Sequence, residues 1–392
     1  MSELTGTGGF ADAVRALTVG ADNRAVVDLP DRVGLAAEAL GAGPAEIWLA
    51  DYQQRSLVPL SGGEVVDIAS SIAGRAFLSA EAVEVERDDH FVLWLPLVDG
   101  VDRIGVLELE FPSQVPLASA PDLACFASIV ATKVVSGALR TDMFARLRRR
   151  RDMALAAELQ WQMLPPLSSS TGFVTVAGML EPAYDVGGDL FDYAHNGRFT
   201  HFALFDAVGH GLESSLVSTL AVGTYRHSRR RNDGLLATAD LLDHTIHDRF
   251  PDSQFVTGLL FILDADTGQL NWLNAGHPPP MLLRGGKVVA ELETPPRPPL
   301  GLGHLMPEPP TPGLHQLEPG DRVLLYTDGV TEARTPSGDD FGVERLAELL
   351  ERADASGYSA IEVVRRLSHA VLDHHGGRLA DDATTLLVAW HP

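Results

Sequence analysis

Four aspartate positions share a setting that could do chemistry, because each lies where an apolar segment meets glycines or a turn. Asp206 ends the segment FALF, and Asp328 ends the segment VLLYT. Asp189 follows a pair of glycines, and Asp381 with Asp382 directly precedes TTLLVAW. Short apolar runs of this kind predict buried strands. A single aspartate before a glycine is most simply a turn residue, but four such positions favour one shared rim, where backbone can approach a ligand closely.

Carboxylates gathered at one rim repel one another. At a separation of about 5 Å, each pair is unfavourable by roughly 3 kcal/mol at an effective dielectric of 20. Such a cluster is stable only where some carboxylates take up a proton or a cation lies among them. Oxygen ligands without His or Cys favour a hard ion, Mg²⁺ or Mn²⁺. Two such ions, about 3.5–4 Å apart, activate a water and hold a phosphoryl group for in-line attack. The acids therefore predict a phosphoester hydrolase.

Other phosphate chemistries fit the sequence less well. A cysteine phosphatase requires an arginine six residues after its cysteine, and the residue six after Cys125 is Ala131. The stretch FILDADTG imitates an aspartyl-phosphate motif with Asp264 and Asp266, but its fifth position is Gly268, so a hairpin turn explains it better. The double glycine of VGGD is not followed by Lys-Ser or Lys-Thr, which excludes a P-loop.

Several histidines are candidates for proton transfer or metal binding. His210, in GHG, could protonate a leaving oxygen, since histidine is the side chain best suited to proton transfer near neutral pH; alternatively, it hydrogen-bonds and shapes the turn. His277, in NAGH, is expected to structure a strand end rather than to transfer protons. His244 and His247 are spaced three apart on a predicted helix, and no zinc site is expected there without further ligands.

The elements that must position these residues form a mixed α/β pattern from about Phe173 onward. Paired helical segments interrupt a series of apolar strands, which favours an α/β sandwich over a doubly wound sheet. The helices are predicted near 212–231, 234–249, 343–352 and 359–374, and the strands over 173–180, 199–205, 255–263, 270–275, 280–284, 322–327 and 384–390.

The N-terminal part of the chain is predicted to be a separate α/β unit followed by a helix. It contains a hairpin, FVLWLPLVDGVDRIGVLELEF, and a helix from about Ala120 to Val135. A long helical pattern follows, with an apolar stripe and the run RLRRRRD; this pattern fits a solvated helix face, a dimeric signalling helix, or both. The predicted domains are an N-terminal extension (1–23), the α/β unit (24–136), a linker helix with possible coiled-coil pairing (137–164) and the C-terminal domain (165–392).

Composition limits the partners and the compartment. The chain has 392 residues and a formal net charge of −23, which argues against nucleic acid and favours cations. No signal peptide and no membrane-spanning run are expected. A single cysteine agrees with a reducing cytoplasm.

Six motifs in order carry a resemblance to a known family: YDVGGDLFDY, FDAVGHG, LNAGHPPP, PPLGL, LLYTDGVTEA and DDATTLLV. They resemble the bacterial SpoIIE-type branch of the PPM (type 2C) serine/threonine phosphatases, and AAELQWQMLPP is similar to the helix that leads into that domain. The match spans about Ala156 to Trp390. It implies an αββα sandwich with two Mn²⁺ or Mg²⁺ ions. The arginine with which eukaryotic relatives grip phosphate has no evident counterpart here.

The resemblance also implies roles for individual residues. Asp206 would bridge both ions, with the backbone carbonyl of Ala207 nearby, and Asp189 would help to hold one ion. Asp328 and Asp381 would hold the other. Asp382 takes a place where relatives carry Asp or Asn, so it is expected to support the ligands rather than to bind an ion. Catalysis would then rest on Asp206 and Asp189, with His210 as a possible acid.

The implied substrate is a phosphoserine or phosphothreonine on a regulatory protein, such as an anti-sigma-factor antagonist. The N-terminal unit resembles a GAF domain in AEIWLAD, IAGRAFLSAEAV and the hairpin, which implies a small-molecule ligand, a homodimer and regulation of the phosphatase. Two alternatives remain: a signalling scaffold, or pseudophosphatase, that binds a partner without catalysis, and a phosphatase that acts on small molecules.

Overall fold

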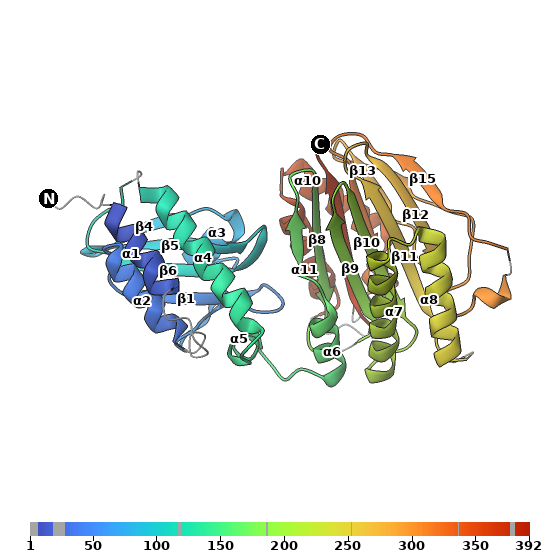
Figure 1. The fold of residues 1–392 in the computed structure, drawn as a ribbon, viewed down its shortest axis with the longest axis horizontal. Helices are drawn as coiled ribbons and strands as arrows, with labels where there is room; N and C mark the ends of the chain where they lie inside the picture. Colours follow the sequence, from blue (N-terminus) through green and yellow to red (C-terminus); the bar gives the residue numbers. More distant parts are fainter. Residues whose placement is uncertain are drawn as a thin grey trace. The chain divides into compact units, whose positions relative to one another are not determined.

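The computed structural model describes residues 7–18, 28–116, 119–185, 187–251, 253–306, 308–335, 337–376 and 381–392. The chain divides into two compact units, Met1–Arg151 and Asp152–Pro392 (Figure 1).

The first unit is built on a six-stranded antiparallel sheet with the strand order β3-β2-β1-β6-β5-β4. The hairpin predicted from the sequence is confirmed as the pair β5 and β6, and the helix predicted from Ala120 is confirmed as α4. The strands are β1 (Ala45–Ala50), β2 (Ser56–Pro59), β3 (Val66–Asp67), β4 (Val83–Arg87), β5 (His90–Asp99) and β6 (Asp102–Phe111). The helices are α1 (Thr7–Thr18), α2 (Leu29–Ala39), α3 (Ile72–Ser79), α4 (Ala120–Ala138) and α5 (Met143–Arg148).

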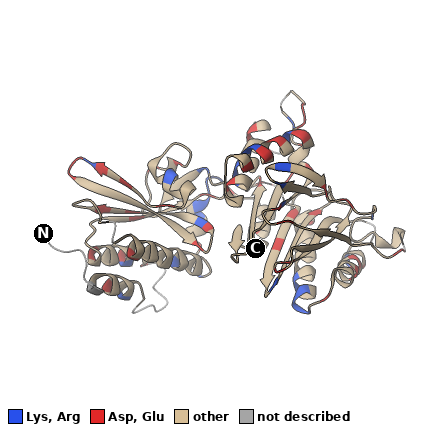
Figure 2. Ribbon diagram, turned by 90° about the horizontal axis from the view of Figure 1, so that it is seen from above, with Lys and Arg blue, Asp and Glu red and all other residues tan. Residues whose placement is uncertain are grey.

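Alternation along the strands gives this sheet two different faces. On β5, Leu93 and Leu95 face the core shared with α1, α2 and α4, and in Figure 2 helices of this unit lie together below its sheet. Val92 and Trp94 face the opposite side, where they form a second, smaller core with Phe77 of α3. Both faces of the central strands are therefore buried.

The predicted N-terminal extension is not separate from this unit where the structure describes it. Residues 1–6 and 19–23 lie outside the described residues. Ala13 and Leu17 of α1 are buried in the core of the unit. The guanidinium of Arg32 donates from Nε and Nη2 to the carbonyl of Ala16, at 2.9 and 2.7 Å. The helix α1 therefore belongs to the first unit.

Residues 137–164 do not form the single linker helix expected from their periodicity. The helix α4 ends at Ala138, α5 ends at Arg148, and the next helix starts at Leu155. Arg148 donates to the carbonyl of Ala50 at 2.8 Å and stacks over a tyrosine ring. Arg149 has extended backbone angles. The side chain of Arg148 is thus held by the end of β1, and the helix α5 ends within the arginine run, where Arg149 leaves the helical conformation. The expected apolar stripe is interrupted as well, since Met143 and Leu147 pack on the first unit.

One helix has the length and composition of a membrane-spanning segment, although none was expected from the sequence. Among the described residues, α4 alone is long and apolar enough. Phe126, Val130 and Ala131 of this helix are buried in the core of the first unit, as in the core helix of a globular domain.

The second unit contains two antiparallel sheets. One has five strands in the order β15-β12-β11-β10-β9, and the other has six in the order β14-β13-β16-β17-β8-β7. The strands are β7 (Ser168–Ser170), β8 (Val174–Glu181), β9 (Asp189–Asn196), β10 (Phe199–Ala207), β11 (Val256–Asp264), β12 (Gln269–Ala275), β13 (Met281–Arg284), β14 (Lys287–Glu291), β15 (Gly313–Gln316), β16 (Arg322–Tyr326) and β17 (Ala383–Trp390).

Helices cover the outer face of each sheet, so that four layers result (Figure 1). The inner faces share one core that includes Phe202 and Phe261 of the first sheet and Leu386 of the second. A separate core joins α7 and α8 to the five-stranded sheet. The predicted αββα sandwich is confirmed. Its helices are α6 (Leu155–Met163), α7 (Leu212–Arg230), α8 (Leu235–Arg249), α9 (Asp328–Thr331), α10 (Val343–Ala355) and α11 (Ala360–His374), with a 3₁₀ turn η2 (Gly303–Leu305).

The helix α6 is part of this second unit, although the sequence placed it in the linker. Ala156 and Ala157 are buried. The indole of Trp161 donates to the carbonyl of Ala183 at 2.9 Å, and the amide of Ala154 donates to Tyr184 at 2.7 Å. The domain therefore begins near residue 152 rather than at 165.

This boundary predicts a difference between two fragments. Residues 152–392 retain α6, whereas residues 165–392 lose its hydrogen bonds and apolar contacts. We expect the shorter fragment to be less stable by more than about 3 kcal/mol, because several buried contacts are removed together. Urea unfolding followed by circular dichroism measures the difference. Equal unfolding midpoints would mean that α6 does not stabilise the domain and is part of the linker.

Candidate active site

The acids singled out in the sequence meet at one end of the sandwich, and they come from both sheets. Asp189 begins β9 and Asp206 lies near the end of β10; the two are directly opposite partners in the antiparallel pair. Asp328 follows β16, and Asp381 and Asp382 precede β17. Because β16 pairs with β17, these last three residues share an end of the second sheet.

Hydrogen bonds join the two sheets at this end. The amide of Asp189 donates to Oδ2 of Asp382 at 3.1 Å. The hydroxyl of Thr327 donates to Oδ2 of Asp189 at 2.7 Å, and the same hydroxyl accepts the amide of Thr384 at 2.9 Å. Asp189 of the first sheet and Asp382 of the second are therefore parts of one hydrogen-bonded site.

Gln160 of α6 also reaches into this site. Its side chain is fully buried, and its Nε2 donates to the carbonyl of Asp189 and to Oδ2 of Asp382, both at 2.9 Å. One amide group thus contacts a residue of each sheet. Gln160 could not be recognised from the sequence, since a glutamine within an amphipathic helix carries no distinctive spacing.

Burial and like charge raise the pKa values of these carboxyl groups. Burial is the main cause for Asp189, whose pKa lies well above its usual range, with the charge of Asp206 adding to the effect. Burial raises the pKa of Asp206 to about 7, and the charges of Asp328 and Asp381 contribute. Burial likewise raises the pKa of Asp382 to about 7. The ionised form of carboxyl groups in this position is unfavourable unless protons or cations neutralise the charge.

The donor set fits a hard divalent cation. The site offers carboxylate oxygens from two sheets, and Oδ1 of Asp382 is buried without a hydrogen-bond partner in the described structure. As they stand, no three Asp, Glu, His or Cys side chains of the described residues form a group that could hold an ion. Binding would therefore draw the side chains closer together, which is feasible for Asp328 and Asp381 because both are exposed.

Glycines allow the acidic loops to approach one another. A Cβ atom at Gly329, directly after Asp328, would collide with the backbone carbonyl of Asp382. A Cβ at Gly187 would collide with the hydroxyl of Ser215 on α7. The glycines next to the acids are thus required by close packing between loops.

His210 lies in an exposed turn that leads from β10 into α7. Gly209 and Gly211 on either side have φ angles of 87° and 81°, in the left-handed region that favours glycine. The backbone carbonyl group of Ala207, also singled out in the sequence, belongs to a residue that is almost fully buried. Its amide donates to the carbonyl of Gly188 at 3.2 Å.

His277 has the structural role expected from the sequence. Its ring is buried, with Nδ1 at 2.7 Å from the hydroxyl of Thr257 on β11 and Nε2 at 3.1 Å from the carbonyl of Tyr326 on β16. Burial lowers the pKa of His277 to about 4. Since Thr257 is paired with Asp206, a neutral histidine links the two sheets directly beside the acids.

A buried ion cluster holds α7 against β9. Asp192 accepts hydrogen bonds from Arg226 at 2.7 and 2.9 Å and from Arg229 at 2.6 Å. Arg226 also donates to the carbonyl of Met163, at the end of α6, at 2.6 Å. With two guanidinium groups and charge-assisted bonds, the buried carboxylate of Asp192 is neutralised. This cluster fixes α6 and α7 together on the strand that begins with Asp189.

A comparison with family models assigns the domain that carries this site. The model of the Stage II sporulation protein E (SpoIIE) family matches residues 196–391, which is half of the chain. The chain belongs to the SpoIIE family. Asp206, Asp328, Asp381 and Asp382 lie inside the matched range, and Asp189 lies seven residues before it.

Curated relatives of this SpoIIE-type chain include phosphatases. It is 24% identical over 242 residues to the phosphoserine phosphatase RsbU of Bacillus subtilis, covering 60% of this chain and 69% of RsbU. It is 24% identical over 251 residues to the phosphoserine phosphatase RsbP of Bacillus subtilis, covering 62% of this chain and 59% of RsbP. A match of 29% identity to the protein IcfG of Synechocystis covers 35% of this chain and only 21% of IcfG.

Solved structures share the fold of the SpoIIE-type domain. The RsbU and RsbW domains of a Mycobacterium tuberculosis protein align with a TM-score of 0.50 and 23% identity, over 59% of this chain and 63% of that one. The SiaA-PP2C domain of Pseudomonas aeruginosa aligns with a TM-score of 0.50 and 20% identity, over 60% of this chain and 94% of that one. At these identities the likeness concerns the fold.

Gln160 provides a test of how the SpoIIE-type site is held together. We expect Gln160→Leu to lower the stability of the 152–392 domain by about 2 kcal/mol, because it removes a buried hydrogen bond to a carboxylate. We also expect weaker Mn²⁺ binding in calorimetric titrations, because Asp382 and Asp189 lose their shared donor. Gln162→Leu, at an exposed position of the same helix, is the matched control. Equal losses in both variants would contradict a positioning role for Gln160.

The lowered pKa of His277 implies that the stability of the domain depends on pH. Its pKa of about 4 in the folded state lies below the value of about 6.5 for an unfolded histidine. The unfolded chain therefore binds the proton first as the pH falls, and the free energy of unfolding decreases between pH 6.5 and 4. Between pH 7 and 5 this histidine is expected to contribute a loss of about 2 kcal/mol.

Urea unfolding of residues 152–392 at both pH values measures this loss against a His277→Gln variant. The variant should be less stable at pH 7 and should lack this part of the pH dependence. An identical pH dependence in the two proteins would mean that His277 is not buried in its neutral form.

Proposed function

We propose that the domain 152–392 is a metal-dependent protein phosphatase that hydrolyses a phosphoserine or phosphothreonine on a regulatory protein. The observation that carries this proposal is the meeting of Asp189, Asp206, Asp328 and Asp381 from both sheets at one end of a SpoIIE-type sandwich. Four like-charged acids gathered at one end of a fold have no stabilising role, since their mutual repulsion and the burial of Asp189 oppose folding. Such an arrangement is typical of functional sites.

The proposed ligands of two Mn²⁺ or Mg²⁺ ions are the residues that the sequence indicated. Asp206 would help to hold both ions, with the backbone carbonyl of Ala207 contributing nearby. Asp189 would help to hold one ion, and Asp328 and Asp381 the other. Bound there, such ions would supply Lewis acidity for water activation and for neutralising the phosphoryl charge. Asp382 would hold the backbone of Asp189 in place, a role supported by their 3.1 Å hydrogen bond.

His210 is proposed as the group that donates a proton to the leaving oxygen of the substrate. Its exposed turn follows Asp206 by four residues, and the glycines on either side let the backbone carry the imidazole into solvent. A histidine is suited to this step because its ordinary pKa lies near neutrality. The alternative is that His210 only shapes the turn before α7.

The proposed substrate is supported by the relatives, and the proposed regulation is supported by the first unit. The relatives RsbU and RsbP are named phosphoserine phosphatases, which supports a phosphoprotein substrate such as an anti-sigma-factor antagonist. We further propose that the first unit is a GAF-like domain that controls this activity, that the protein is a homodimer, and that it acts in the cytoplasm. The six-stranded sheet with helices on its two faces supports a sensor unit of this type.

Hydrolysis of a phosphoserine peptide and of p-nitrophenyl phosphate by the full chain tests the proposal. Activity is expected with Mn²⁺ or Mg²⁺ and not with EDTA. Asp206→Asn should lower turnover by at least ~100-fold, the scale seen when one preorganised electrostatic group is removed, while circular dichroism remains unchanged. Asp266→Asn, at an exposed turn remote from the acids in the fold, is the matched control.

Two results would contradict the proposal. Full activity of Asp206→Asn would refute the assignment of the ligands. Absence of turnover with every metal and with both substrates would favour the non-catalytic scaffold, which would bind its partner through the same family fold.

A further inference from the structure

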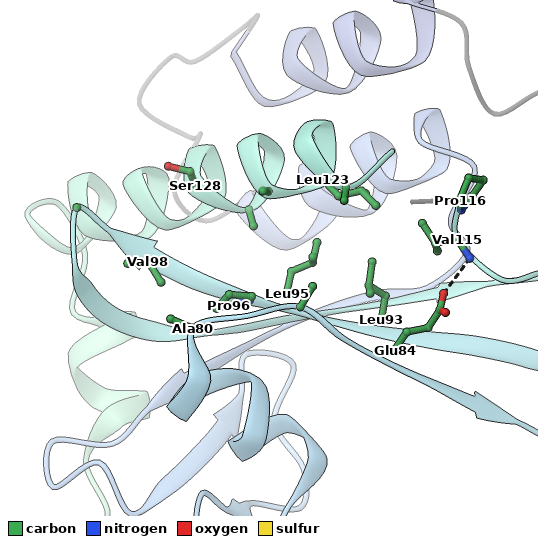
Figure 3. A pocket seen from close by; sticks show the side chains of 15 residues that line it. Ala80, Glu84, Leu93, Leu95, Pro96, Val98, Val115, Pro116, Leu123 and Ser128 are labelled. Atoms are coloured by element: carbon green, nitrogen blue, oxygen red, sulfur yellow. Dashed lines mark hydrogen bonds between the residues drawn. The ribbon is translucent and has the colours of Figure 1, made fainter. Parts of the chain in front are cut away.

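The first unit contains a groove that the proposed phosphatase activity does not use. It lies between α4 and the strands β4 and β5, has a volume of about 460 Å³, and is shown from close by in Figure 3. Cavities of this size are common for small-molecule sites. The residues that matter for its chemistry are Glu84, Leu93, Leu95, Val98, Leu123 and Ala127.

The groove exists because α4 presents small side chains toward this edge of the sheet. Ala124, Ala127 and Ser128 line it, whereas Phe126 and Val130 of the same helix point into the core. In Figure 3 the leucines of β5 point up toward the helix across the groove. The opposite face of the sheet is filled by Phe77 and Trp94.

One carboxylate lies at an end of this apolar groove. Glu84 is the one charged side chain among the described residues that line it. Its Oε1 accepts a hydrogen bond from the amide of Val115 at 2.8 Å, which fixes the orientation of the group (Figure 3). The lining stretch of α4 from Ala120 to Ser128 is about 12 Å long at 1.5 Å per residue.

We propose that this groove binds an elongated, mainly apolar small molecule that carries a protonated amine at one end. The apolar length would be buried against Leu93, Leu95 and Leu123, and the amine would donate to the carboxylate of Glu84. The formal net charge of −23 further favours a cation over an anion near this surface. A ligand with a carboxylate end is disfavoured because it would face Glu84.

Titration calorimetry on the full chain tests this proposal with three probes of equal length: decylamine, decanol and decanoate. We expect decylamine to bind saturably with one site per chain, and at least ten times more tightly than decanoate. Glu84→Gln should weaken decylamine binding about tenfold and remove its advantage over decanol. Glu86→Gln changes an exposed glutamate on the same strand that does not line the groove, and it should have no effect.

Ala124→Trp is a second variant, and it is expected to fill the groove without disturbing the fold. Ala124 is exposed and lines the groove, so a larger side chain there fills the groove without entering the core. It should abolish binding of decylamine with an unchanged thermal unfolding midpoint. The proposal is overturned if decylamine and decanoate bind equally, if neither Glu84→Gln nor Ala124→Trp changes binding, or if no probe binds.

A further result would also overturn it. If Ala124→Trp changes the mass of the particle in light scattering and no amine binds to the original protein, the groove is a contact between copies of the chain. All of these readouts are independent of phosphatase turnover, so their failure leaves the proposed function of the other unit untouched.

Discussion

Mutual repulsion among carboxylates is the constraint on which the second unit depends. Asp189, Asp206 and Asp382 are drawn from two sheets into a site where burial already raises their pKa values. The surrounding structure supplies hydrogen-bond donors that stabilise this charge, including the side-chain amide of Gln160 and the hydroxyl of Thr327. Such a site must be held by its scaffold, because the acids by themselves would move apart.

The scaffold meets this demand with polar links placed outside the acids. His277 bonds to both sheets as a neutral ring, and Asp192 with its two arginines holds α7 on the strand that starts the site. Arg226 extends the same cluster to the end of α6. These links are buried or partly buried and each depends on hydrogen bonds, so they hold the two sheets and the helices α6 and α7 in fixed positions. The apolar core supplies the stability, and these links determine the geometry.

Much of this arrangement could be predicted from the sequence, because its signals are local. The helices α7, α8, α10 and α11 and most strands follow from periodicity, and the acids follow from their strand-end positions. The strand β9 was missed because DLFDYAHN mixes acids with aromatics and lacks clear alternation. The break in the predicted linker and the contribution of Gln160 depend on contacts distant in sequence, Arg148 with Ala50 and Gln160 with Asp382. Spacing alone cannot reveal them.

The close approach at Gly329 has a consequence for how the motif TDG is understood. Its aspartate has a chemical reason to be present, whereas its glycine is set by the backbone of Asp382, which leaves no room for a side chain. Any chain that brings these two loops together in the same way faces the same exclusion, whether or not it is a catalyst. The glycine of this motif is therefore evidence for the fold of the domain, and only the aspartate is evidence for its chemistry.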